Sequence, residues 1–142
     1  MKNEDNLKEY MIKEIEIIQD IIKRMASNSF IIKGWAITLV VVSLLLRGSN
    51  IYQVWIAFIP LLVFWRLDAY FLRQERLYRK LYEWVVINRL KTEEHLFNIK
   101  TCRFKEDVQS NLRTMFSMTL VWFYGSIAVL MTIYILVTLN FK

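Results

Sequence analysis

Four cations that follow the second apolar run of this chain share one face of a predicted helix. They are Arg66, Arg73, Arg76 and Lys80. Steps of seven, three and four residues separate them, and these steps return a side chain to the same side of an α-helix. Aromatic residues are interleaved with them: Tyr70, Phe71, Tyr78, Tyr82 and Trp84. Cations that neutralise phosphates and rings that stack on bases are what single-stranded nucleic acid requires.

Anionic lipid headgroups are the other class of ligand that this composition fits, because Lys and Arg beside a membrane span bind them in the same way. The pattern does not separate lipid from nucleic acid, or DNA from RNA. In the nucleic-acid interpretation, the phosphate ligands are Arg73, Arg76, Arg79 and Lys80, and the candidates for base stacking are Tyr78 and Tyr82. Several copies around an axis would add their cations together and bind a polyanion more strongly.

Signatures of catalytic centres are missing from the sequence. Its three glycines, one histidine and one cysteine form no phosphate-binding loop, nucleophile elbow, dinucleotide fingerprint or zinc spacing. His95 follows Glu93 and Glu94, but adjacent positions face different sides of a helix, which favours a solvated histidine over a metal ligand. We expect no enzyme activity, no metal and no cofactor, and Cys102 has no partner for a disulfide within the chain.

Three apolar runs must position these residues, and they cover 30–46, 51–65 and 115–139. A bilayer core about 30 Å thick takes roughly 20 apolar residues of helix. The middle run is shorter, and it spans the bilayer if Arg66 snorkels outward. With few Gly and Pro residues, the predicted fold class is all-α. We expect an integral membrane protein with three transmembrane helices and a cytosolic helical hairpin, assembled as an oligomeric bundle.

The distribution of Lys and Arg predicts the orientation. Residues 66–113 carry eleven cations against seven acids, whereas residues 47–50 carry one cation, and cytoplasmic flanks hold the excess of positive charge. The expected organisation is an N-terminal amphipathic cytosolic helix (1–29), a transmembrane hairpin (30–65), a cytosolic helical hairpin (66–114) and a third transmembrane helix (115–142). The C-terminus is then outside, and the first run is retained because no signal peptide precedes it.

An amphipathic helix is predicted before the first span and is expected to continue into it. Its apolar seam is Met11, Ile15, Ile18, Ile22 and Met25, which packs either on the protein's own cytosolic helices or between subunits. The second helix is expected to pass the membrane surface and turn between Asn88 and Thr92. Thr92 would then cap a returning helix that starts at Glu93. Asp68 is expected to form an ion pair with a nearby arginine.

Small and hydroxyl-bearing residues on the spans allow two interpretations. The third run places Ser117, Val121, Gly125, Ala128 and Thr132 on one face, where small residues let helices pack closely in lipid. In the alternative, Ser117, Tyr124 and Thr132 line a wet pore. Pro60 is expected to bend the second helix, and the bend serves either gating or packing.

Two stretches carry a resemblance to a known family: RMASNSFIIKGW at 24–35 and FWRLDAYFLRQERLYRKLY at 64–82. They resemble small membrane proteins that are encoded beside nucleotidyltransferases in bacterial anti-phage systems, and they are most similar to the membrane effectors of the Hailong system. The resemblance covers about the first two thirds of the chain. It implies an oligomeric channel in the bacterial inner (cytoplasmic) membrane, kept shut by a single-stranded DNA oligomer that the partner enzyme makes and opened when that DNA is lost.

The resulting hypothesis is an ion channel that acts as an anti-phage effector in abortive infection. A single-stranded oligonucleotide or other polyanion, bound in a basic cytosolic vestibule, holds it closed. The expected partners are membrane lipids, further copies of the chain and the DNA oligomer. Two alternatives stay open: a non-conducting membrane anchor that recruits a cytosolic partner, and a holin-like protein that permeabilises the membrane without a ligand.

Overall fold

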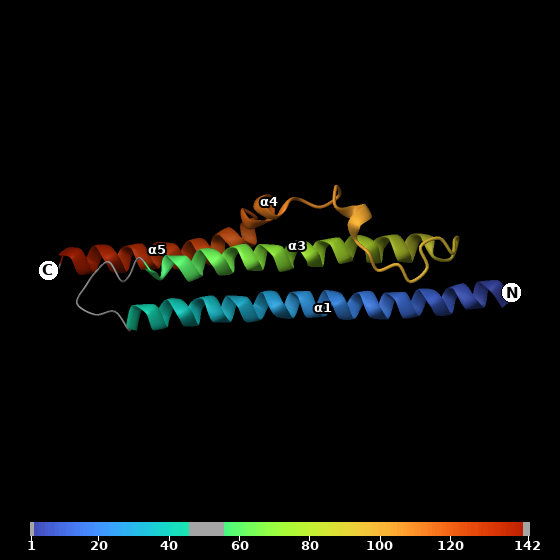
Figure 1. The fold of residues 1–142 in the computed structure, drawn as a ribbon, viewed down its shortest axis with the longest axis horizontal. Helices are drawn as coiled ribbons and strands as arrows, with labels where there is room; N and C mark the ends of the chain where they lie inside the picture. Colours follow the sequence, from blue (N-terminus) through green and yellow to red (C-terminus); the bar gives the residue numbers. More distant parts are fainter. Residues whose placement is uncertain (1, 46–55, 141–142) are drawn as a thin grey trace. The chain divides into compact units, whose positions relative to one another are not determined.

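The computed structural model describes residues 2–45 and 56–140. In chain order these ranges contain α1 (Lys2–Leu45), α3 (Phe58–Asn88), the 3-10 helix η1 (Cys102–Phe104), α4 (Asn111–Met115) and α5 (Met118–Asn140) (Figure 1). No strand occurs within them, so the predicted all-α class is confirmed. The predicted outside turn at 47–50 and the C-terminal Lys142 lie outside the described residues.

The chain divides into two units. The first consists of Met1–Ser27 and Phe71–Gln109, and the second of Asn28–Tyr70 and Ser110–Lys142. We call them the charged unit and the apolar unit, because the second contains the first and third apolar runs. Helices α1 and α3 contribute residues to both.

Helix α1 is one continuous helix through the amphipathic segment and the first apolar run, as predicted. In the charged unit its seam packs on α3: Ile18 is buried in a core formed with Leu77, Leu81, Val85, Phe104 and Val108. Met11, Ile15 and Ile22 pack partly buried against this core. The seam is therefore used, at least in part, for packing on the protein's own helices.

The predicted returning helix of the cytosolic hairpin is wrong. Helix α3 ends at Asn88 and the chain turns there as expected, but residues 90–110 contain only turns, η1 and irregular structure. The Thr92 hydroxyl accepts a hydrogen bond from the Glu94 N–H at 3.0 Å, so it caps a turn instead of a helix. His95 and Phe97 adopt left-handed backbone, with φ of 58° and 53°, which a right-handed helix cannot accommodate.

The buried side chain of Arg89 explains this path. Its guanidinium donates hydrogen bonds to the carbonyl oxygens of Thr92, Glu94 and His95 at 2.8 to 3.2 Å. It also pairs with the carboxylate of Glu14 on α1, at 2.9 Å between Nη2 and Oε1. Because a buried guanidinium needs all of these acceptors, the segment wraps around Arg89 and its carbonyls are withdrawn from helical hydrogen bonding.

In the apolar unit the helices bury residues at helical spacing: Ala36 and Val40 of α1, Leu61 and Ala69 of α3, and Leu120, Tyr124, Met131 and Ile135 of α5. Helices α1 and α5 each contain a stretch long and apolar enough to cross a membrane, and only 22% of each stretch is buried. Apolar helices that are mostly uncovered are compatible with a membrane protein. The described apolar part of α3 ends at Arg66, so the second span stays a prediction.

Pro60 lies in the first turn of α3. Ile56 is helical, Ala57 is in a turn, and α3 begins at Phe58. A proline in a first turn removes no helical hydrogen bond, because the N–H groups there have no partner within the helix. The residues directly before Ile56 lie outside the described ranges, so the bend predicted at Pro60 and its role in gating or packing stay predictions.

We predict that Arg89→Met will lower the free energy of unfolding by about 3–5 kcal/mol, because it leaves the buried Glu14 carboxylate without its cation. Unfolding of the detergent-solubilised chain by SDS, followed by circular dichroism, measures this loss. Lys13→Met is the control, since Lys13 pairs with Glu9 on the exposed surface and its loss should leave the unfolding curve unchanged. Equal shifts for the two variants would contradict the role given to Arg89.

Candidate functional site

The first candidate site is a groove on the charged unit, with a volume of about 290 Å³. We call it the basic groove, and its lining residues are Arg76, Arg79, Lys80, Glu83, Asp107, Val108 and Gln109. Three of the four predicted phosphate ligands line it. The fourth, Arg73, is next to it, since its Nε donates a hydrogen bond to the carbonyl of Gln109 at 2.9 Å. Arg73, Arg76 and Lys80 of the predicted helical face thus lie at one groove, whereas Arg66, the first cation of that face, lines a different groove.

Carboxylates already hold two of these cations. Arg79 pairs with Glu75 and Lys80 with Glu83, each at 2.7 Å, and the hydrogen bond that Lys80 donates to the Glu83 carboxylate raises the pKa of Lys80 above its usual range. The pair of Lys80 with Glu83 is exposed on both sides, and such pairs stabilise a protein little, so a ligand phosphate can replace the Glu83 carboxylate at small cost. Arg76 makes no hydrogen bond or ion pair within the part of the chain that the structure describes. Of the four predicted phosphate ligands, it is the one whose charge is most available to a ligand.

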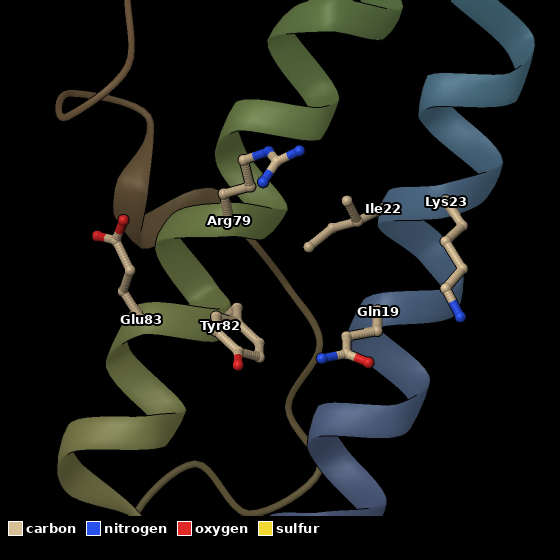
Figure 2. Close-up of a pocket in the computed structure, with 6 residues that line it drawn as sticks. All are labelled: Gln19, Ile22, Lys23, Arg79, Tyr82 and Glu83. Atoms are coloured by element: carbon tan, nitrogen blue, oxygen red, sulfur yellow. The ribbon is translucent and has the colours of Figure 1, made fainter.

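A second groove of about 470 Å³ shares Arg79 and Glu83 with the basic groove. Figure 2 shows Gln19 and Ile22 extending from α1 toward Arg79 and Tyr82 of α3. Lys23 also lines it. The sequence interpretation missed Gln19 and Lys23, because α1 was assigned only a packing role. Gln19 lies three residues before Ile22 and so on the same side of α1, and this spacing was the signal that could have placed Gln19 opposite α3.

The aromatic residues predicted to stack on bases are largely engaged in packing. Tyr78 and Tyr82 are partly buried against the core of the charged unit. The ring of Trp84 is covered by the guanidinium of Arg103, 4.1 Å from the ring centroid. Of the two predicted stacking residues, Tyr82 also lines the second groove. The structure therefore gathers the predicted cations but not the predicted rings.

The second candidate site is a buried polar cluster in the apolar unit. The carboxylate of Asp68 on α3 is fully buried and forms an ion pair with Lys33 of α1 at 2.6 Å. It accepts hydrogen bonds from the hydroxyls of Ser29 on α1 and Tyr124 on α5, the latter at 3.1 Å. We call these four residues the Asp68 cluster. It joins three helices at one carboxylate.

The predicted partner of Asp68 is corrected by this geometry: the cation is Lys33, not an arginine. Arg66 precedes Asp68 by two residues and therefore faces a different side of α3. It is exposed and forms no ion pair within the described ranges. The sequence offered no signal for Lys33, because pairing between distant helices leaves no local pattern.

Aromatic rings surround the Asp68 cluster. Trp65 stacks on Tyr124 with ring centroids 5.8 Å apart, and its indole N–H donates to the carbonyl of Met115 at 2.8 Å. Lys33 Nζ lies 5.9 Å from the ring of Phe123. A buried charge is tolerated in such surroundings only when it is paired and hydrogen-bonded. Ionisable groups buried among membrane helices are candidates for a functional role.

The residues predicted to line a pore or to pack helices do not form one surface. Tyr124 is buried within the single chain. The Ser117 hydroxyl is buried without a hydrogen-bond partner among the described residues, and the exposed Thr132 donates to the carbonyl of Ala128 at 2.8 Å. Gly125 has open space where a Cβ would lie. The face that α5 buries is not the predicted small-residue face, and pore lining stays a prediction about assembled subunits.

Comparison with known proteins assigns no family. The chain matches no family model, no curated protein and no solved structure. The resemblance to Hailong effectors thus stays an expectation from two sequence stretches, and function is argued from the geometry.

We predict that Glu83→Gln will tighten the binding of a single-stranded oligonucleotide by about two- to fivefold, because it frees Lys80 and removes a negative charge from both grooves. Fluorescence anisotropy with a labelled oligonucleotide at low salt measures the affinity of the detergent-solubilised chain. Glu93→Gln removes the same charge from an exposed position of the charged unit that lines neither groove. If both variants tighten binding equally, net charge and not the groove controls it.

For the Asp68 cluster we predict that Lys33→Met costs about 3–5 kcal/mol of unfolding free energy, since it leaves Asp68 buried and unpaired. Combining it with Asp68→Leu should cost less than the sum of the two single changes, by about 1–3 kcal/mol. The same SDS unfolding measurement completes this double-mutant cycle. Additive losses would show that the two side chains do not interact.

Proposed function

We propose that this chain is the subunit of an oligomeric membrane ion channel, and that the basic groove binds a single-stranded oligonucleotide or similar polyanion that favours the closed state. The observation that carries the proposal is the unpaired Arg76 beside Arg79 and Lys80 in one groove. These residues lie on α3, the helix that also carries Asp68 in the apolar unit. A ligand in the groove therefore binds the same helix that is tied to α1 and α5.

The charge balance of the groove supports a multivalent ligand. Glu83 and Asp107 oppose three cations in one copy, so a single groove binds one phosphate weakly. A strand that contacts the grooves of several copies neutralises more phosphates at once, and its affinity rises with their number. Oligomerisation turns a weak local site into one suited to a polyanion.

Open positions on the apolar helices support assembly of several copies. Gly34 on α1 and Gly125 on α5 both have empty space where a Cβ would lie, and small residues let helices approach closely in lipid. In our proposal α1, the second apolar run and α5 cross the membrane in this order along the chain. The charged unit then lies in the cytoplasm. The ion path forms between copies of the chain.

Gating requires that the ligand bind the closed form more tightly than the open form. To change the ratio of closed to open channels from 1:99 to 99:1, the ligand must bind the closed form about 10⁴-fold more tightly than the open form. A modest preference at each groove multiplies over the copies and can reach this value. In the defence role that the resemblance implies, loss of the oligonucleotide opens the channel and depolarises the infected cell.

A non-conducting membrane anchor is the second candidate function, and one observation favours it. Hydroxyls on the apolar helices donate to carbonyls of their own helix: Thr38 to Gly34, Ser126 to Phe123 and Thr132 to Ala128. Hydroxyls satisfied in this way suit contact with lipid and need no water-filled path.

We predict that Arg76→Gln combined with Lys80→Gln will weaken oligonucleotide binding about tenfold or more at low salt. The slope of log affinity against log salt should fall by about 1.4, because two phosphate contacts are lost. Lys91→Gln combined with Lys100→Gln is the matched control, since these exposed lysines carry the same charge and do not line the groove. Unchanged binding in the groove variant would contradict the assignment.

The same groove variant tests the channel in cells. If the ligand holds the gate shut, bacteria that produce the ligand and the Arg76→Gln, Lys80→Gln chain will be depolarised, as a membrane-potential dye reports. Cells with the Lys91→Gln, Lys100→Gln chain should stay polarised. Lost binding without depolarisation would favour the anchor.

A further inference from the structure

We propose that the apolar unit binds the headgroup phosphate of an anionic phospholipid in a groove of about 360 Å³. Val63, Arg66, Leu67 and Tyr70 of α3 line it, together with Asn111 of α4. None of these residues lines the basic groove. The inference rests on the membrane location of the apolar unit and not on ion conduction.

The charge of Arg66 is available for a ligand. Its side chain is exposed and makes no hydrogen bond or ion pair within the described ranges. The acid closest to it in sequence, Asp68, is buried and already pairs with Lys33. An uncompensated guanidinium at the end of an apolar run suits a phosphate, which it can bind with two parallel hydrogen bonds.

An exposed apolar stripe leads to Arg66 along the same helix. Ile59, Leu62 and Val63 are exposed by 61%, 53% and 58% of their surface, and they precede Arg66 at steps that keep them on one side of α3. An acyl chain can pack on this stripe while its phosphate meets Arg66. The stripe and the guanidinium together match the apolar and charged ends of one phospholipid.

The polar end of the groove fits the interfacial part of a lipid. Tyr70 places an aromatic ring with a hydroxyl there, which is the type of side chain enriched at headgroup level. The Asn111 amide offers N–H donors to phosphate or glycerol oxygens. No carboxylate lines the groove, so a negatively charged headgroup is not repelled and a choline cation finds no acidic partner.

Nucleic acid fits this groove less well than lipid. Only one cation lines it, whereas three line the basic groove. Affinity for a nucleic-acid strand depends on how many phosphates are neutralised, and the apolar stripe has no cation that could neutralise a phosphate. A single phosphate with an attached hydrocarbon chain uses both parts of the surface.

Native mass spectrometry of the full chain in a mild detergent, titrated with phosphatidylglycerol or phosphatidylcholine, tests the proposal. We expect phosphatidylglycerol to bind about five- to tenfold more tightly, and Arg66→Gln to remove this preference. Arg113→Gln should retain it, because Arg113 is an exposed cation of α4 that does not line the groove. Equal losses in the two variants would overturn the proposal in favour of general surface charge.

Asn111→Asp keeps the test decisive if Arg66→Gln fails to fold. It introduces a carboxylate at the first residue of α4, a position where acids are tolerated, and it should also abolish the preference for phosphatidylglycerol.

A last measurement uses a short single-stranded oligonucleotide in place of the lipid. If Arg66→Gln weakens its binding as much as Arg76→Gln does, the phosphate belongs to nucleic acid and the lipid site is refuted. Lost lipid preference with intact oligonucleotide binding supports the lipid site independently of the channel proposal.

Discussion

A carboxylate buried among apolar helices must be paired, and this requirement organises the apolar unit. Asp68 is met by Lys33 and Ser29 from α1 and by Tyr124 from α5. Such a pair adds little net stability, because desolvation offsets the attraction, but an unpaired partner is costly. We infer that the cluster fixes the register of the three helices. With Asp68 paired to Lys33, Arg66 has no ion pair among the described residues, and it is the cation that we propose for a lipid phosphate.

The charged unit contains a second buried pair with a different consequence. Arg89 binds Glu14 and three backbone carbonyls, and the segment after α3 wraps around it instead of forming a helix. That segment returns along α3 and places Asp107 and Gln109 beside the cations of the basic groove. The basic groove thus depends on the side chain of Arg89, which does not line it.

Local pattern in the sequence predicted the continuity of α1, because few helix breakers interrupt it, and the turn after Asn88, because Thr92 is a capping residue. Helical spacing predicted that Arg73, Arg76 and Lys80 lie together. It failed where long-range side-chain bonds decide the structure. Arg89 is one of eleven cations in residues 66–113, and its partner Glu14 lies 75 positions away. The predicted returning helix does not form, because the bonds of Arg89 to Glu14 and to the backbone carbonyls hold this segment in an irregular path. The sequence pattern did not show that Tyr78 and Tyr82 also pack partly buried against the core of the charged unit, and base stacking by these two rings stays a prediction.

Ion flux through liposomes that contain the purified chain tests the central claim most directly. The measurement compares vesicles with and without a short single-stranded DNA added on the side of the charged unit. We predict flux that the DNA suppresses, and weaker suppression with the Arg76→Gln, Lys80→Gln chain. Absence of flux in both conditions would contradict the channel and favour a membrane anchor, and flux that the DNA does not change would contradict control by a bound polyanion.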